Sequence, residues 1–343
     1  MTVSLEYLMS AMLPLVESEM KDVLRAHPDE SSGLFYQMMH YHMGWLDENL
    51  TSTQGNGGKR IRPVLSLLCA SASGAAWQSA IPAAAAIELL HNFTLIHDDI
   101  QDASPTRRGR PTLWKLWGMA QAINSGDCMF ALAHTALYGL QDRDVPSNTV
   151  VRAAKRFDDT CLALTLGQHR DMNFESQMDV SVEDYVQMIG GKTAALLALC
   201  GELGSLVGGA EDETVAHYTE FCRNLGLAFQ IKDDILGIWG DESAIGKSAA
   251  TDIETRKKTL PVLYGLARSA ELKELYTTTP VNDDTFVTRV VLLLNELGAL
   301  EYAQDDAERY SRKALEHLNA AGPLGEAAEA LHELASHLLA RQH

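Results

Sequence analysis

Apolar and polar residues follow one another along this chain with the three- and four-residue spacing of amphipathic helices. Ala, Leu, Met, Glu and Gln dominate nearly every segment, and no stretch shows the sustained Val, Ile and Thr alternation that is typical of strands. Gly, Pro, Ser, Asp and Asn gather where the helical pattern breaks. These breaks fall at residues 27–33, 51–58, 103–111, 141–148, 237–255 and 277–284. The pattern predicts an all-α protein with roughly ten or more helices.

The breaks between the predicted helices are short. None is long enough to act as a linker between domains, and no internal repeat is present. We therefore expect one domain over residues 1–343, folded as a single large helical bundle. The segment after about residue 284 is helical in pattern and carries no assignable motif.

Composition and charge narrow the classes of function. The chain is 46% apolar, which is ample for a buried core, and its formal net charge is -18. An acidic surface repels the phosphate backbone of nucleic acids, so we expect no nucleic-acid partner. The five cysteines are odd in number and form no CxxC pair, which predicts reduced thiols in the core.

The N-terminal segment and the most apolar run bear on the location of the protein. The first twenty residues carry three glutamates and no basic stretch, unlike a signal peptide. The longest candidate membrane span, residues 81–96, is interrupted by Glu88 and His91. We expect no transmembrane segment and a cytoplasmic protein.

The first concentration of candidate chemistry ends a strongly apolar helical run, ELLHNFTLIHDDIQD. Asp98 and Asp102 are i,i+4 neighbours on one helical face, so their carboxylates can hold the same cation. Such carboxylates repel by roughly a few tenths of a kcal/mol on a solvated helix, and by more beside an apolar turn. Bound Mg²⁺ removes this repulsion. The alternative interpretation is a charged helix end or an exit from helix to loop.

A second apolar run also leads into an aspartate pair, in GLAFQIKDDILGIWGD. Asp233 and Asp234 lie about 135 residues after the first pair, and two carboxylate clusters on separate helices can face each other across a bundle core. Divalent ions held between them would form a site for a diphosphate. In the alternative interpretation these two aspartates are surface residues.

Five motifs together make the sequence similar to the trans-isoprenyl diphosphate synthase family, from about residue 55 to residue 265. In order they are GGKRIRP, DDIQD followed by RRGRPT, LGQHRD, GGKTAAL, and FQIKDDILGIWGD leading to GKSAATDIETRKKTLP. The resemblance implies the helical bundle of the isoprenoid synthase type. It also implies a Mg²⁺-dependent enzyme that joins an allylic diphosphate (C5, C10 or C15) to isopentenyl diphosphate and releases pyrophosphate. A homodimer is expected on the same ground.

The resemblance also assigns roles to individual residues. Asp98 and Asp102 would bind Mg²⁺ directly with Asp99 assisting, and Asp233 would bind a further ion with Asp234 in support, for two or three ions in all. Arginine offers a planar fork of donors to phosphate oxygens, and lysine offers a compact charge. Arg107 would support the allylic diphosphate, and the diphosphate of isopentenyl diphosphate would be held by Lys59, Arg62, His91 and Arg108.

His91 lies seven residues before Asp98, about 20° away on a helical projection, and thus shares its face. The alternative is a satisfied core histidine.

Further residues would surround the reacting carbon atoms. Lys192 and Thr193 resemble the pair that contacts the leaving diphosphate and the developing cation. Gln168, Asp171 and Gln230 would line the same cavity, and Lys247 and Lys257 match lysines of a loop that closes over the allylic diphosphate. For the two loop lysines the alternative is a solvated, charged loop.

Product length is the least direct inference. Phe93 stands five residues before Asp98 and Thr94 four, and DDIQD carries no insertion. In the family this arrangement resembles the C20 type, which implies geranylgeranyl diphosphate. An ideal helix places Thr94 within about 40° of Asp98 but Phe93 about 140° away, so the geometry is less clear than the family's rule. Farnesyl diphosphate and chains of C25 and above are the alternatives.

The second motif departs from the family's usual pattern. Gly237 stands where a third aspartate is common, and Asp241 is expected to assist through water. Three rival functions remain. A class I terpene cyclase has no need of GGKRIRP or of the second arginine. A non-catalytic regulatory subunit of a synthase usually has damaged aspartate motifs, and a purely structural helical protein has no reason to carry all five.

Overall fold

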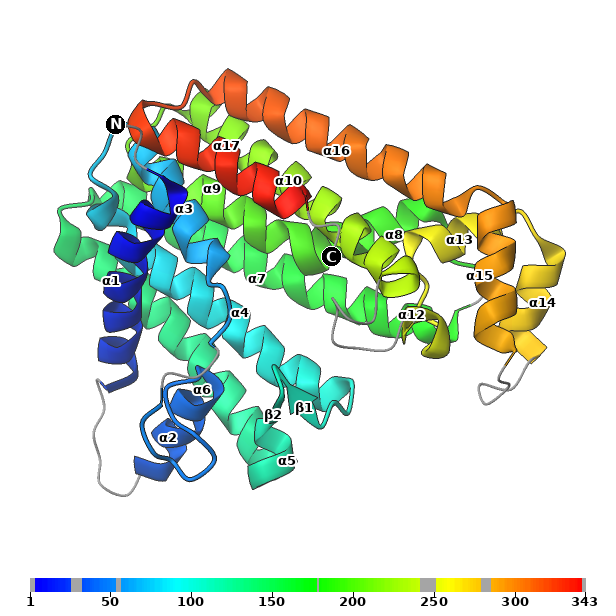
Figure 1. Ribbon diagram of the computed structural model, residues 1–343. Helices are drawn as coiled ribbons and strands as arrows, with labels where there is room; N and C mark the ends of the chain where they lie inside the picture. The colour runs from blue at the N-terminus through cyan, green and yellow to red at the C-terminus, as the bar shows by residue number, and fades with distance from the viewer. Residues whose placement is uncertain are drawn as a thin grey trace. The chain divides into compact units, whose positions relative to one another are not determined.

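The computed structural model describes residues 4–25, 33–53, 57–177, 179–240, 251–278 and 285–340 (Figure 1). In these ranges the chain is almost wholly helical, which confirms the all-α prediction. Strand structure in the described part is confined to a two-residue hairpin, β1 (Thr106–Arg107) with β2 (Arg110–Pro111), and one isolated bridge between Leu46 and Ser52. The hairpin pairs antiparallel, with Arg107 opposite Arg110. Sequence periodicity did not predict it, because two-residue strands are too short to show alternation.

The chain divides into two compact units. The first unit comprises Met1–Phe157, Leu199–Val215 and Pro323–Leu331, and the second comprises Asp158–Ala198, Ala216–Gly322 and His332–His343. The division passes through four helices, namely α7 (Ser147–Ser176), α9 (Ala195–Val207), α10 (Asp212–Trp239) and α17 (Gly325–Leu339). The prediction of a single domain stays a prediction.

The first unit is organised around α4 (Ile81–Gln101). Its first ten residues are all buried, and the four consecutive alanines among them let neighbouring helices approach closely. Pro82 is tolerated because it lies in the first turn of the helix. Helices α6, α3 and α1 pack against it, and Figure 1 shows α4 and α6 side by side. The other elements of this unit are α1 (Leu5–Arg25), α2 (Gly33–His42), α3 (Ile61–Ala72), η2 (Trp77–Ala80), α5 (Leu113–Trp117), α6 (Met119–Tyr138) and η3 (Gly139–Arg143).

The second unit contains two hydrophobic clusters. One joins Tyr185, Ile231 and Leu260 with residues of α16, and the other surrounds Phe286. The elements are α8 (Val182–Ile189), η4 (Gly190–Ala194), α12 (Thr251–Glu254), α13 (Leu260–Leu266), α14 (Ala270–Thr278), α15 (Phe286–Glu296) and α16 (Ala299–Ala321). The described residues after 284 therefore form three helices with short breaks at 297–298 and 322–324, and are mainly helical as the periodicity predicted.

Among the residues that the structure describes, one segment, Trp77–Gln101, is long and apolar enough to cross a membrane by composition alone. Of its most apolar window, 72% is buried inside the protein, as expected for a core helix. The cytoplasmic location stays a prediction. All five cysteines are free, and Cys69, Cys200 and Cys222 are buried.

Candidate active site

The first aspartate motif forms the end of α4. Asp98 and Asp99 lie in its last turn, and Asp102 caps the helix with its backbone N–H donating to the Asp98 carbonyl at 2.8 Å. Asp102 is exposed and Asp98 partly exposed, whereas Asp99 is only 2% exposed. Successive helical residues point about 100° apart, so the two accessible carboxylates share a face and Asp99 points elsewhere.

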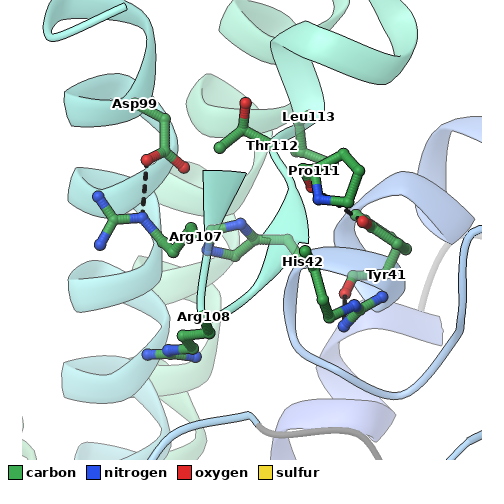
Figure 2. A pocket seen from close by; sticks show the side chains of 9 residues that line it. Tyr41, His42, Asp99, Arg107, Arg108, Pro111, Thr112 and Leu113 are labelled. Carbon is green, nitrogen blue, oxygen red and sulfur yellow. Dashed lines mark hydrogen bonds and ion pairs between the residues drawn. The ribbon is translucent and has the colours of Figure 1, made fainter. Parts of the chain in front are cut away.

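Asp99 is held by the hairpin. Arg107 of β1 donates from Nε to Asp99 Oδ1 at 2.7 Å, as Figure 2 shows. Burial raises the pKa of Asp99, and the charge of Arg107 opposes that rise. The hairpin itself is fixed by Arg110, which donates to the carbonyls of Tyr41 (3.2 Å) and Leu46 (2.6 Å). Arg110 was not predicted as a site residue, although it stands in RRGRPT.

The glycines of GGKRIRP allow the cationic side chains to approach. A Cβ atom on Gly58 would lie 2.8 Å from Nη2 of Arg108, and one on Gly57 would lie 2.9 Å from Nη2 of Arg60. Arg108 has φ +53 in the turn of the hairpin, so the turn directs its side chain away from that of Arg107 (Figure 2). Two motifs that are fifty residues apart in sequence thus meet within the first unit.

His91 and Arg62 are in direct contact, as their predicted joint role requires. Arg62 Nη1 lies 3.2 Å from His91 Nε2, one turn after the buried Glu88. Burial, followed by the charges of Arg62, Arg108 and Arg107, holds the pKa of His91 well below its ordinary value. Burial likewise raises the pKa of Glu88. The imidazole is therefore neutral at pH 7, and an arriving anion would raise its affinity for a proton. Lys59 is exposed nearby in sequence.

His42 joins this cationic region without having been predicted. Burial and the charges of Arg108 and Arg107 lower its pKa to about 3. It lines a pocket at the hairpin, drawn in Figure 2, with Tyr41, Asp99, Arg107, Arg108, Arg110, Pro111, Thr112 and Leu113. No sequence signal marked His42, because it is set among methionines and tyrosines in α2.

Phe93 begins a series of aromatic rings that contact one another edge-on or tilted, beneath the first motif. Its ring centroid lies 4.8 Å from that of His97 and 5.0 Å from that of Phe130 on α6, and His134 and Phe157 continue the series. Thr94 turns its hydroxyl back to the carbonyl of His91 at 2.8 Å. Phe93 therefore lies on the side of α4 that faces α6.

In the second unit, Lys192 and Thr193 lie in a single π-helical turn, η4. Lys192 Nζ pairs with the carboxylate of Asp171 on α7. This pairing depends on two glycines, since a Cβ on Gly191 would lie 2.8 Å from the carbonyl oxygen of Ala163 and a Cβ on Gly167 would clash with the backbone nitrogen of Lys192. The partly exposed Asp171 and Lys192 were predicted to line one cavity, and the structure brings them together.

A chain of hydrogen bonds runs from Thr193 to Tyr185. Thr193 Oγ1 donates to Gln230 Oε1 at 2.8 Å, and Gln230 Nε2 donates to Asp234 Oδ1 at 3.0 Å. Asp234 Oδ2 accepts from the Tyr185 hydroxyl and from the Leu260 backbone N–H at 3.4 Å. Both oxygens of this 2% exposed carboxylate thus have protein donors. Asp233, its neighbour on α10, remains partly exposed.

Charge around Asp234 is mixed. Burial raises the pKa of Asp234. The charge of Lys257 and the hydrogen bonds from Tyr185 and Gln230 oppose this rise, and the charge of Asp252 adds to it. Burial and the Asp234 charge raise the pKa of Tyr185 well above its ordinary value, so the hydroxyl keeps its proton. Sequence reasoning missed Tyr185, whose position in an amphipathic helix looks like that of any core aromatic.

The remaining predicted residues are placed as follows. Gln168 is on α7, three residues before Asp171. Lys257 is exposed after α12, while Lys247 and Asp241 lie outside the described residues. Lys232, which stands beside the second aspartate pair, donates from Nζ to the carbonyl of Leu339.

The carboxylates fit Mg²⁺ rather than a metal held by protein alone. Among the described residues, no group of three or more His, Cys, Asp or Glu side chains converges on one point. Mg²⁺ usually takes one or two carboxylates and completes its shell with water and substrate phosphates. Asp98 with Asp102 in the first unit, and Asp233 in the second, offer such partial sets.

Comparisons with known proteins agree with this chemistry. The family model described as polyprenyl synthetase matches residues 43–293. The chain is 42% identical to a geranylgeranyl diphosphate synthase of Mycobacterium tuberculosis over 81% of its own length and 79% of the relative's. It is 36% identical to a (2E,6E)-farnesyl diphosphate synthase of Mycobacterium bovis over 96% of its length and 92% of the relative's.

Solved structures show the same fold. A polyprenyl synthetase from Streptomyces coelicolor superposes with a TM-score of 0.85 at 35% identity, covering 97% of this chain and 98% of that one. A geranylgeranyl pyrophosphate synthetase from Pyrococcus horikoshii gives 0.86 at 31% identity, with coverage of 98% and 99%.

Proposed function

The chain belongs to the polyprenyl synthetase family and is a trans-prenyltransferase, and we propose that it extends an allylic diphosphate with isopentenyl diphosphate to geranylgeranyl diphosphate. The observation that carries the proposal is the end of α4. There the accessible carboxylates of Asp98 and Asp102 lie about two and three turns beyond His91, which contacts Arg62 at 3.2 Å. Carboxylates for a metal beside cations for phosphate are what a metal-bound diphosphate requires.

The chemistry begins with departure of pyrophosphate from the allylic substrate. The allylic C–O bond breaks and the electron pair leaves with the pyrophosphate. In the first unit, Arg107 would supply fixed positive charge to a departing diphosphate. In the second unit, Lys192, which Asp171 orients, and Lys257 would supply charge of the same kind. Asp98 and Asp102 in the first unit would hold Mg²⁺, and Asp233 in the second unit would hold a further ion. Bound metal would supply additional positive charge for a diphosphate. Lys59, Arg62, His91 and Arg108 hold the diphosphate of isopentenyl diphosphate.

The carbon–carbon bond then forms between the double bond of isopentenyl diphosphate and the allylic carbon. The resulting cation loses a proton, which the released pyrophosphate takes, so no side chain is assigned as general base. The Thr193 and Gln230 oxygens are dipoles for the developing cation. The buried apolar face of α4 excludes water that would otherwise capture it.

The C20 product is supported by Phe93 and by the relatives. Phe93 is backed by Phe130 at 5.0 Å, so the ring is braced rather than free to swing aside. One relative is named a geranylgeranyl diphosphate synthase, which corresponds to a C20 product, and another a farnesyl diphosphate synthase, which corresponds to C15.

Product analysis tests the function. Purified protein is incubated with Mg²⁺, isopentenyl diphosphate and each of the C5, C10 and C15 allylic diphosphates, and the products are measured by mass spectrometry. We expect a C20 diphosphate that disappears with chelator and with Asp98→Ala. A final product of C15, or of C25 and above, would keep the mechanism and overturn the chain length. Hydrocarbon products would identify a terpene cyclase, and untouched substrates a regulatory subunit.

Chain length has its own variant. Phe93→Ala opens the space in front of Phe130 and should shift part of the product beyond C20. The double variant Phe93→Ala/Phe130→Ala should shift it further. Tyr138→Ala, an exposed aromatic on the same α6, is the matched control. An unchanged product spectrum in the double variant would show that other residues form the floor.

The homodimer belongs to the same proposal. Large apolar side chains are exposed on α6 of the first unit, among them Met119 (56%) and Ile123 (41%). Exposed apolar side chains on one helix are typical of an interface between subunits. Light scattering should give twice the chain mass of 37.6 kDa; a single-chain mass at micromolar concentration would contradict it.

A further inference from the structure

The second aspartate motif has no carboxylate at its fifth position, Gly237, and the carboxylate of a residue on another helix lies close to that position. Gly237 lies four residues after Asp233 on α10, so the two share a helical face. An aspartate at this position would place a third carboxylate on the metal-facing side. The chain has a glycine instead, and α12 approaches that glycine closely.

The close approach is made by the carboxylate of Asp252. A Cβ atom on Gly237 would lie 2.7 Å from Cγ of Asp252 and 3.3 Å from Oδ1, with Oδ2 closer still. An aspartate carries its own carboxylate oxygens about 2.4 Å from its Cβ, the span of two covalent bonds. The Asp252 carboxylate therefore occupies the space in which the carboxylate of an aspartate at position 237 would lie.

We propose that Asp252 supplies the carboxylate that the second motif lacks, and that it binds the Mg²⁺–diphosphate group together with Asp233. The inference rests on the proposed function, since that function provides the metal. It assigns a residue fifteen positions after Gly237 in sequence to the motif by position in space.

Charge supports this assignment. Cγ of Asp252 would lie 2.7 Å from a Cβ on Gly237, which places its negative charge beside the second motif. The backbone N–H of Lys257 donates to the Asp252 carbonyl at 2.8 Å, which fixes the end of α12. Negative charges gathered in this way repel one another, and a divalent cation shared between Asp233 and Asp252 relieves that repulsion.

The same geometry explains the glycine. A side chain at position 237 and the Asp252 carboxylate cannot occupy one space, so the motif can take its third carboxylate from α10 or from α12, but not from both. The carboxylate can consequently be moved from one helix to the other by mutation. A merely structural role for Asp252 would not be transferable.

The test measures metal binding directly. Mn²⁺ affinity is determined by electron paramagnetic resonance in the presence of inorganic pyrophosphate, for the full chain and for Asp252→Ala. We expect Asp252→Ala to weaken Mn²⁺ binding about tenfold. The double variant Asp252→Ala/Gly237→Asp should restore it to within about threefold of the original. Glu254→Ala, an exposed acid on the same short helix, is the matched control and should bind as the original does.

Two results would overturn the assignment. One is unchanged Mn²⁺ affinity in Asp252→Ala, and the other is a folded double variant that remains as weak as the single one. If the double variant does not fold, Gly237→Ala decides instead, because its Cβ displaces the intact Asp252 carboxylate and should weaken Mn²⁺ binding as Asp252→Ala does. Because Mn²⁺ binding is read without turnover, its failure differs from a failure of the product assay.

Discussion

The two aspartate pairs look alike in sequence, and the two units hold them differently. In both pairs the first aspartate is partly exposed and the second is 2% exposed. Asp99 is held by the charge of Arg107, whereas Asp234 is held by uncharged donors from Tyr185, Gln230 and Leu260. The first unit gathers arginines around its pair, whereas the second surrounds its pair with neutral donors, the acid Asp252 and the cation Lys257.

The difference indicates that the two aspartates of a DD pair have separate roles. On a helix, consecutive side chains point about 100° apart, so one carboxylate can face substrate only if the other faces the protein. We infer that Asp98 and Asp233 act in chemistry while Asp99 and Asp234 fix the helix ends. The bracing differs because arginine tolerates partial exposure, whereas Tyr185 and Asp234 are fully enclosed.

The largest effect is expected for the accessible aspartates. Asp98→Asn and Asp233→Asn remove charge without changing shape and should each lower kcat at least about 100-fold. The melting temperature should hold or rise, because a repelling charge is lost. Exposed Asp142→Asn and Asp305→Asn serve as matched controls for the two units. A stability loss with intact turnover would reverse the division of work.

The next effect is on stability and separates the two buried aspartates. Asp234→Ala leaves the Tyr185 hydroxyl and the Leu260 N–H buried without an acceptor, and should lower the free energy of unfolding by about 3 kcal/mol. Asp99→Ala should cost about 1.5 kcal/mol, because Arg107 is 30% exposed and water replaces its partner.

Denaturant unfolding at low and high salt sharpens this contrast. Salt screens the partly exposed ion pair, so the cost of Asp99→Ala should shrink in 1 M NaCl, where the Debye length is about 3 Å, while that of Asp234→Ala stays constant. Equal salt dependence would contradict the distinction between charged and neutral bracing.

Acid should destabilise the cationic region of the first unit. The pKa of His42 is about 3 in the folded protein, below its ordinary 6.5. Between these values the unfolded chain binds a proton that the folded protein does not, so stability falls as pH falls. From pH 7 to pH 5 His42 should cost about 2 kcal/mol, with His91 acting in the same direction.

This pH dependence is measured by denaturant unfolding at both pH values. His42→Gln should flatten it, and exposed His337→Gln should leave it unchanged. A steeper dependence in His42→Gln would show that His42 is protonated in the folded state.

The smallest effect concerns the brace of the second pair. Tyr185→Phe removes one donor to Asp234 and should lower stability by about 1 kcal/mol, with little further loss when combined with Asp234→Ala. A full additive loss in this double-mutant cycle, followed by thermal unfolding, would mean that the hydroxyl does not act through Asp234.

Much of the helical pattern could be predicted because burial in this protein repeats every three to four residues. Motif order also brought together residues that the structure places in contact, such as Arg62 with His91, Lys192 with Asp171, and Thr193 with Gln230. Each of these contacts lies within a single unit, the first in unit 1 and the other two in unit 2.

The sequence did not show which carboxylate of each pair would be buried. That depends on segments distant in the chain, the hairpin for Asp99 and α8 for Asp234. Nor could it place Asp252 against Gly237, because the connection over 241–250 leaves the register of α12 open. Tyr185 and His42 were missed since polar atoms on mostly apolar helices carry no periodic signal.

The two adjacent glycines of GGKTAAL look the same in sequence, but the structure leaves different amounts of space for a side chain at each. Nothing lies within 4 Å of a Cβ on Gly190, whereas one on Gly191 would press into α7. In a library selected for growth on the enzyme's product, codon 190 should drift through many amino acids while codon 191 stays fixed. Close packing between two helices would thus appear in the selected sequences as a variable position next to an invariant one.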